Sequence, residues 1–364
     1  MNNKTLKLDS LSFIISVILF LFLCTGIILS PYTASQGALE GIECCISVLV
    51  PSLFPFIFLS SYAVMSGISD KLGKLFSKIT LNLFSLPSET GVTVFLSLIG
   101  GFPTGAAGIS SLYKRRLITA KQAQRMLYFC VNSGPGFLIS VVGAKLYKNA
   151  EIGYILTAVQ ITVSILTGIF LSLFAKEKEP LQISGHKEKT APSFSEAFIS
   201  SCRSACLSMA MMCSLVVLFS CFTDLTVFFL GLNTNSAVGI LFRSICEVTD
   251  GCTAIADTRL PIYFVAACIG FGGICVHLQI FSYLSDIKIN RFKFISGRII
   301  SGLLCGTVTY IICRVYPVTV SVFSNNDNVS YQISSATHYG SIALMISMTA
   351  FLICTSGIFK KPAE

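Results

Sequence analysis

The sequence predicts an all-α polytopic membrane protein that contains an inverted repeat of two similar units. Of its 364 residues 53% are apolar and only 12% are charged, about half the charged fraction of a typical soluble domain. Apolar runs long enough to cross about 30 Å of hydrocarbon recur along the chain, and their interruptions recur in the same order in its two halves. The net charge of +9 lies mainly in loops beside these runs, which disfavours a secreted disulfide scaffold, a disordered tail or a nucleic-acid binder.

The first apolar run covers residues 11–29 and follows Lys4 and Lys7. It is longer than the apolar core of a signal peptide, and no A-x-A cleavage site follows it. We therefore expect residues 1–38 to contain a retained N-terminal transmembrane helix.

Two of the later apolar runs have polar or helix-breaking residues near their middles. Residues 91–108 contain GGFPTGAAG and residues 236–256 contain EVTDG, which would be costly in an unbroken helix facing lipid. We interpret both as re-entrant hairpins and the other runs as crossings, giving about eight crossings plus two hairpins. The runs after the first are 42–65, 91–108, 126–142, 152–175, 205–222, 236–256, 261–284, 294–316 and 339–359.

The basic residues agree with this interpretation. With a cytoplasmic N-terminus and two hairpins that do not cross, 20 of the 26 Lys and Arg residues lie in cytoplasmic loops. Only three lie in outer loops, as the positive-inside rule requires. If both hairpins crossed, the basic segment 114–125 would face outward. We therefore expect both termini to be cytoplasmic.

The segments divide into two units with the same order: a span, a hairpin, a broken span and a span. The first unit is 39–175 and the second is 195–316; a charged cytoplasmic linker, 176–194, joins them. Because each unit crosses three times, the second is inverted relative to the first. An outer loop and a C-terminal transmembrane helix follow in 317–364. Inverted repeats with paired broken helices are typical of secondary transporters, whose substrates bind where the breaks meet.

Five motifs in this order resemble one known family. They are PSLFPF (51–56), GGFPTG (100–105), NSGPGF (132–137), EVTDG (247–251) and GGICVHLQ (272–279). Together they resemble the YlbJ family of sporulation integral membrane proteins, also called SpoVV. The resemblance implies two copies of the nucleoside-recognition Gate domain, related to concentrative nucleoside transporters. It also implies movement of dipicolinic acid across the outer forespore membrane during sporulation.

Polar side chains near the breaks are the candidate ligands, because a helix that stops inside the membrane leaves backbone groups unpaired. Neutral hydroxyl and amide groups can donate hydrogen bonds to an anion, while two carboxylates could hold a proton, Na⁺ or a co-bound Ca²⁺. We expect no other cofactor and no resident metal site. The predicted substrate-binding residues are Thr104, Asn132, Ser133, Thr249, His277, Gln279 and Arg298, and the predicted ion-coupling residues are Glu247 and Asp250.

Two charged positions allow more than one interpretation. Arg243 could contact an anionic substrate, or it could form a structural i,i+4 ion pair with Glu247. Glu43 is interpreted as a marker of the outer interface, where a charged group can reach water.

The sequence contains no zinc-protease motif, phosphate-binding loop or nucleophile elbow, so we expect no enzyme activity. The predicted function is secondary-type transport of a small anionic metabolite, with dipicolinic acid as the implied substrate. Transport of nucleosides or another small polar metabolite, and a non-transporting sporulation scaffold, remain alternatives. The expected partners are the substrate and the lipid bilayer, with no nucleic acid; a homo-oligomer stays open. The expected location is the cell membrane or the outer forespore membrane.

Overall fold

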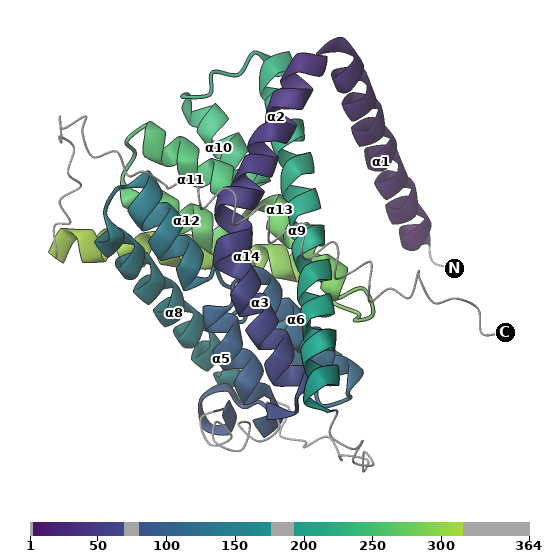
Figure 1. Ribbon diagram of the computed structural model, residues 1–364, viewed down its shortest axis with the longest axis vertical. Helices are drawn as coiled ribbons and strands as arrows, with labels where there is room; N and C mark the ends of the chain where they lie inside the picture. The colour runs from purple at the N-terminus through teal and green to yellow at the C-terminus, as the bar shows by residue number, and fades with distance from the viewer. Residues whose placement is uncertain (1–2, 69–79, 176–192, 316–364) are drawn as a thin grey trace.

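A computed structural model describes residues 3–68, 80–175 and 193–315, and every regular element in these ranges is helical (Figure 1). Most of the predicted linker 176–194 and the whole predicted segment 317–364, with its final span 339–359, lie outside the described residues. The described residues form a helical membrane protein, which confirms the helical membrane class.

The first unit begins with one long, continuous helical rod. It starts 11 residues before the predicted span 42–65, because Pro31 occupies the first helical turn, where its missing N–H costs nothing. Pro55 lies inside the rod, and a wider π-helical turn precedes Val50. The N-terminal helix α1 (Asn3–Leu29) leads into α2 (Pro31–Cys44), the π-helical turn Cys45–Leu49 and α3 (Val50–Met65).

The predicted first hairpin is present. It consists of α5 (Gly91–Ile99), after a short 3-10 turn Ser88–Thr90, and α6 (Phe102–Lys114). The chain turns at Gly101, whose φ of 82° favours glycine. The next predicted span, 126–142, has a wide break: α7 (Ala120–Met126) ends at its first residue, and the π-helical segment η3 (Phe137–Leu146) follows. The unit then ends with α8 (Ala150–Leu173).

The second unit has the same order of elements. Helix α9 (Phe194–Leu230) is far longer than the predicted 205–222, because a capping box between Ser193 and Glu196 starts it early and left-handed Gly231 ends it. The hairpin α10 (Ala237–Cys246) and α11 (Val248–Asp257) turns at Glu247. Helices α12 (Ile262–Phe271) and α13 (Gly273–Tyr283) are separated at Gly272, and α14 (Arg291–Val315) follows.

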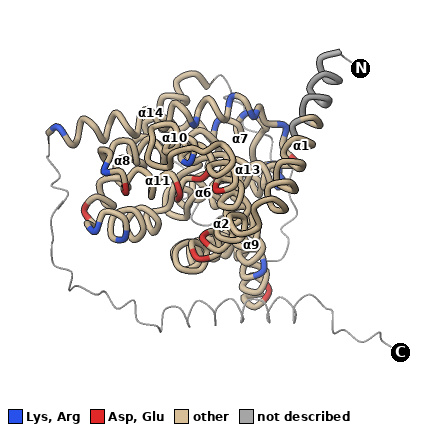
Figure 2. Tube along the Cα trace, turned by 90° about the horizontal axis from the view of Figure 1, so that it is seen from above, with Lys and Arg blue, Asp and Glu red and all other residues tan. Residues whose placement is uncertain are grey.

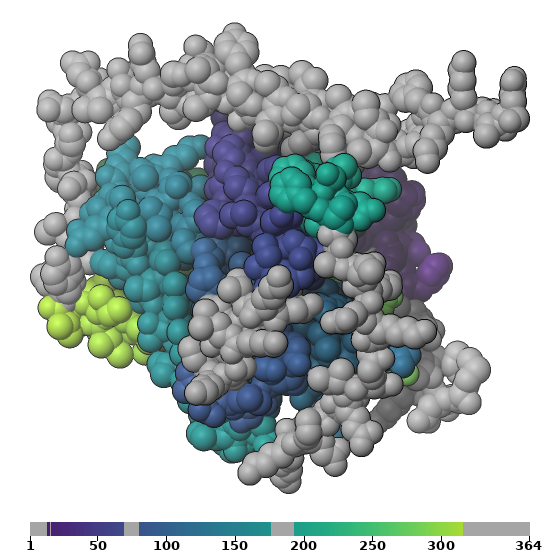
Figure 3. All heavy atoms as spheres, turned by 60° about the horizontal axis from the view of Figure 1, so that its bottom comes forward, coloured from purple at the N-terminus to yellow at the C-terminus, as the bar shows by residue number. Residues whose placement is uncertain are grey.

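The two long rods pack side by side in opposite directions (Figures 1 and 3). A Cβ added at Gly41 of α2 would lie 2.7 Å from the Cα of Val217 in α9. Near the other end the rings of Phe58 and Phe198 are 5.1 Å apart. Small residues therefore allow the close approach of the backbones on which helix association in membranes depends.

Within the described residues, five helical segments are long and apolar enough to cross a membrane, by length and composition. Many of their large apolar side chains are exposed, as expected where lipid is the solvent. Figure 2 shows most Lys and Arg residues toward the periphery, and several Asp and Glu residues nearer the middle, around α11 and α2. The five segments are Pro31–Met65, Ala150–Leu173, Phe194–Leu230, Ile262–Tyr283 and Arg291–Val315.

Candidate functional site

In each unit the tip of the hairpin packs against the helix break of the same unit. A Cβ added at Gly134 would lie 3.2 Å from the backbone nitrogen of Gly101. In the second unit a Cβ added at Gly273 would lie 3.1 Å from the backbone nitrogen of Val248. A side chain at either glycine would crowd the hairpin, so close backbone contact joins each hairpin tip to the break of its own unit.

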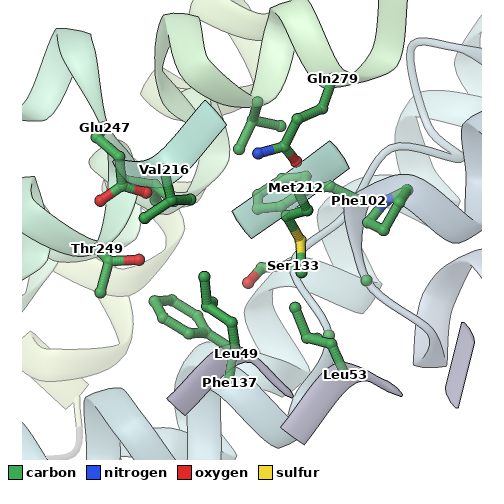
Figure 4. A pocket seen from close by; sticks show the side chains of 15 residues that line it. Leu49, Leu53, Phe102, Ser133, Phe137, Met212, Val216, Glu247, Thr249 and Gln279 are labelled. Atoms are coloured by element: carbon green, nitrogen blue, oxygen red, sulfur yellow. The ribbon is translucent and has the colours of Figure 1, made fainter. Parts of the chain in front are cut away.

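A small cavity of about 30 Å³ lies between the two units at this junction (Figure 4). It has room for about one water molecule. The side-chain oxygens of Ser133 and Thr249 and the amide of Gln279 point toward it. The lining residues come from both hairpins, both breaks and both long rods: Leu49, Leu53, Gly101, Phe102, Pro103, Ser133, Gly134, Phe137, Met212, Val216, Glu247, Val248, Thr249, Val276 and Gln279.

Glu247 is the charged residue of this lining, and it is 4% exposed. Its extended backbone places it at the start of α11, where its carboxylate accepts a hydrogen bond of 2.8 Å from the backbone N–H of Asp250. The positive end of the helix dipole favours an anion at this position. No Lys or Arg of the described ranges forms an ion pair with it. The buried hydroxyl of Thr249 also has no hydrogen-bond partner among the described residues.

A second, larger cavity of about 260 Å³ adjoins the first, because Val216, Glu247 and Thr249 line both. We call it the vestibule. It is lined by four carboxylates and two basic residues, so its charge is net acidic. The charged lining residues are Glu40, Glu43, Lys145, Arg243, Glu247 and Asp250.

Arg243 pairs with Asp250 and not with Glu247, so the i,i+4 alternative is wrong. The Nε of Arg243 donates to the two carboxylate oxygens of Asp250 at 2.9 and 3.0 Å, and a second nitrogen of the guanidinium contacts the same carboxylate. The i,i+4 pairing needs a continuous helix. Glu247 is extended, with φ −144° and ψ 132°, and the chain reverses there, which brings residue i+7 opposite Arg243 instead.

Two predicted ligands, Thr104 and Asn132, are absent from the lining of the cavity, and their polar groups are already hydrogen-bonded. The hydroxyl of Thr104 donates to the Gly100 carbonyl at 2.7 Å, which stabilises the first hairpin. The amide oxygen of Asn132 accepts hydrogen bonds from α8, from Gln160 at 3.3 Å and from Ser164. Its amide nitrogen donates to the Phe129 carbonyl at 2.8 Å, so Asn132 fixes the first break to α8.

His277 and Arg298 meet at the second break. The Nε2 of His277 lies 3.0 Å from the Phe271 carbonyl oxygen, which also accepts from the Nε of Arg298 at 3.2 Å. The Nη1 of Arg298 donates to the Val131 carbonyl of the first break at 2.6 Å. Arg298 therefore joins the breaks of the two units.

Several lining residues were missed by the sequence analysis. Glu43 lines the vestibule together with Glu40, and its place at the outer interface stays a prediction. The two acids are three residues apart, which places them on one face of a helix. The spacing could have predicted a shared acidic face only if the helix had been known to begin at Pro31. The apolar lining, including Phe102 and Phe137, carries no sequence signal that separates it from ordinary core. Among the described residues no group of His, Cys, Asp and Glu is placed to hold a metal ion.

The sequence of the chain is similar to that of one curated protein. The chain is 23% identical over 336 residues to the sporulation integral membrane protein YlbJ of Bacillus subtilis (strain 168), and the match covers 82% of each chain. No family model matches the chain, and no solved structure matches it significantly. The similarity and the five long apolar helices support a multi-pass integral membrane protein.

Proposed function

We propose that this chain is a secondary-type transporter of a small polar metabolite and neither an enzyme nor a scaffold. The cavity between the two units carries the proposal. Hydroxyl, amide and carboxylate groups gather there, at the point where two hairpins and two broken helices meet. Unwound helices inside a membrane are tolerated where they line a cavity, and in transporters they form the substrate site.

The arrangement of the units supports an inverted repeat. Both have the order long helix, hairpin, broken helix, long helix, and their first long helices pack in opposite directions. With the predicted crossings this corresponds to about eight spans, two hairpins and cytoplasmic termini. Each unit would then be a Gate-type domain, and movement of one against the other would expose the cavity to each side in turn.

Dipicolinic acid is the first substrate we propose, moved across the outer forespore membrane during sporulation. The sporulation relative supports that setting. The alternative is a nucleoside or another neutral polar metabolite. It is favoured by the lining of the cavity, which offers neutral donors and acceptors and one carboxylate, with no Lys or Arg among its residues. A non-transporting scaffold would need no such cavity.

We propose that Glu247 alone couples transport to an ion, and that Asp250 is structural. Asp250 is neutralised by Arg243, whereas Glu247 lacks a cationic partner in the described structure and lies between the cavity and the acidic vestibule. A buried carboxylate in this position can take up a proton or Na⁺ that enters through the vestibule. A co-bound Ca²⁺ would use the same carboxylate.

Uptake into proteoliposomes tests both parts of the proposal. The purified full chain should accumulate dipicolinate or uridine under an imposed pH or Na⁺ gradient, with and without Ca²⁺. Glu247→Gln should abolish gradient-driven accumulation and keep exchange of substrate across the membrane, because the site remains but its charge no longer changes. Asp257→Asn, an exposed acid on the same helix, is the matched control and should behave like the parent.

Uptake of neither substrate above that of empty vesicles would contradict the transport function and favour the scaffold. Equal effects of Glu247→Gln and Asp257→Asn would contradict the coupling role alone.

A further inference from the structure

A buried cation lies next to the residues that line the cavity. Arg298 of α14 is 1% exposed, and within the described ranges no carboxylate forms an ion pair with it. Burying an unpaired guanidinium is costly in any protein. Most buried charges are paired or functional, so the surroundings of Arg298 need an explanation.

Backbone carbonyls at the two breaks offset part of the cost. The Nε and Nη1 groups donate to Phe271 and Val131, one carbonyl from each unit. Broken helix ends expose carbonyls of partial negative charge, which suit a cation. The Nη2 group is also buried but has no hydrogen-bond partner in the part of the chain that the structure describes. Two of the three guanidinium nitrogens are thus used to hold the breaks, and the third is left with unused donors.

The ring of Phe102 lies next to this cation and also lines the cavity. The guanidinium carbon of Arg298 lies 5.9 Å from the ring centroid of Phe102, and Phe102 is one of the residues that line the cavity. The ring also lies at the second break, where a Cβ added at Gly272 would be 3.4 Å from it. Phe102 sits at the tip of the first hairpin, next to the turn at Gly101, so a small movement of the tip displaces it.

We propose that Arg298 is a carboxylate-binding site that Phe102 closes in this conformation. When the Phe102 ring moves aside, the cavity extends to the guanidinium, whose free Nη2 donates to one carboxylate of the substrate. The planar guanidinium forms strong charge-assisted hydrogen bonds with carboxylates. The proposal rests on the transport function. It gives the substrate site a preference for carboxylic acids, although no Lys or Arg lines the cavity while Phe102 closes it.

Binding of two matched probes to the purified full chain tests the proposal. Pyridine-2,6-dicarboxylate and pyridine-2,6-dicarboxamide share a ring and a shape but differ in charge. Arg298→Gln should weaken binding of the dicarboxylate by about tenfold or more and change binding of the diamide little. Arg314→Gln, on the exposed part of the same helix, is the matched control and should change neither.

Variants of the ring test the closing role without removing the cation. Phe102→Ala should strengthen binding of the dicarboxylate relative to the diamide, because the path to Arg298 stays open. Phe137→Ala, which removes another aromatic ring of the same lining, should not show this selective gain.

If Arg298→Gln fails to fold, Arg298→Lys and Phe102→Ala decide the question, since both keep a positive charge. Arg298→Lys should bind the dicarboxylate more weakly than the parent, because its ammonium lacks the planar fork.

The possible results separate the two proposals. Equal effects of Arg298→Gln on both probes, or no selective gain in Phe102→Ala, would overturn the carboxylate site. A parent chain that transports uridine but never binds the dicarboxylate would overturn it as well, and the transport function would stand. A parent chain that binds the dicarboxylate through Arg298 but moves no solute would contradict transport alone.

Discussion

Two acids three residues apart have different surroundings, and at the scale of single residues this difference matters most. Asp250 faces Arg243, and both side chains are 21% exposed. Glu247 caps the N-terminus of α11 and faces the cavity. Asp250 therefore stabilises the fold. Glu247 is held in place by a backbone N–H and remains available to a ligand.

Asp250→Asn is expected to destabilise the protein. It leaves Arg243 half-buried without its counter-charge, which should lower the free energy of unfolding by about 2 kcal/mol, less than for a fully buried pair. Thermal unfolding in detergent measures the effect. The double variant Arg243→Gln/Asp250→Asn should recover part of the loss, because neither charge is then unpaired. A double variant less stable than Asp250→Asn would contradict a direct interaction.

Sequence patterns predicted which residue types gather at the breaks but not which of them face the cavity. Ser133, Glu247, Thr249 and Gln279 line it, whereas the Asn132 side chain bonds to α8. Ser133 and Asn132 are neighbours in a non-helical stretch, where no periodicity fixes the direction of a side chain. The partner of Arg243 was unpredictable for the same reason, since the backbone at Glu247 is extended.

At the scale of elements, each hairpin has a glycine at the fourth residue of its second helix. Gly105 follows the turn at Gly101, and Gly251 follows the turn at Glu247. A Cβ added at Gly105 would lie 1.7 Å from the carbonyl oxygen of Cys130, and one added at Gly251 would lie 2.4 Å from the Cα of Ser244. Both contacts are with backbone, which cannot move aside as a flexible side chain can.

Gly105→Ala and Gly251→Ala are therefore expected to lower the free energy of unfolding by about 3 kcal/mol each. Gly67→Ala is the control: its Cβ would meet nothing within 4 Å, so only the left-handed backbone adds a cost of about 1 kcal/mol. The midpoint of thermal unfolding of each purified variant gives the comparison. Equal midpoints for Gly105→Ala and Gly67→Ala would show that the hairpin does not pack against the first break as closely as described.

The hairpins themselves could be predicted, because Gly, Pro and ionisable residues in the middle of an apolar run exclude a lipid-facing helix. The ends of the long helices could not. Polar residues such as Glu40, before the predicted span 42–65, made the start of the first rod look like a loop, yet Glu40 lines the vestibule. Hydropathy averages all faces of a helix, so it underestimates spans that line a polar cavity.

At the scale of the whole molecule, basic loops from the two units meet. Lys114, the last residue of α6, forms an exposed ion pair of 3.1 Å with Asp286, which follows α13. The side chain of Gln124 accepts a hydrogen bond of 2.7 Å from the backbone of Asn290. Both loops are among those predicted to be cytoplasmic. Lys145, one of the three basic residues in the predicted outer loops, lines the vestibule.

Labelling of introduced cysteines is expected to find the segments that contain Lys121 and Lys148 on opposite sides of the membrane. Lys121→Cys should react with an impermeant maleimide only in inside-out vesicles, and Lys148→Cys only in intact cells, because basic loops are retained in the cytoplasm. The parent chain, with its 15 native cysteines, serves as the blank for each preparation. Both positions are exposed, so neither site is hidden by packing.

With this result the vestibule that contains Lys145 would open to the outside, and a coupling ion would reach Glu247 from that face. Reaction of Lys121→Cys in intact cells alone would reverse this direction, and reaction of both on one side would contradict the inverted repeat.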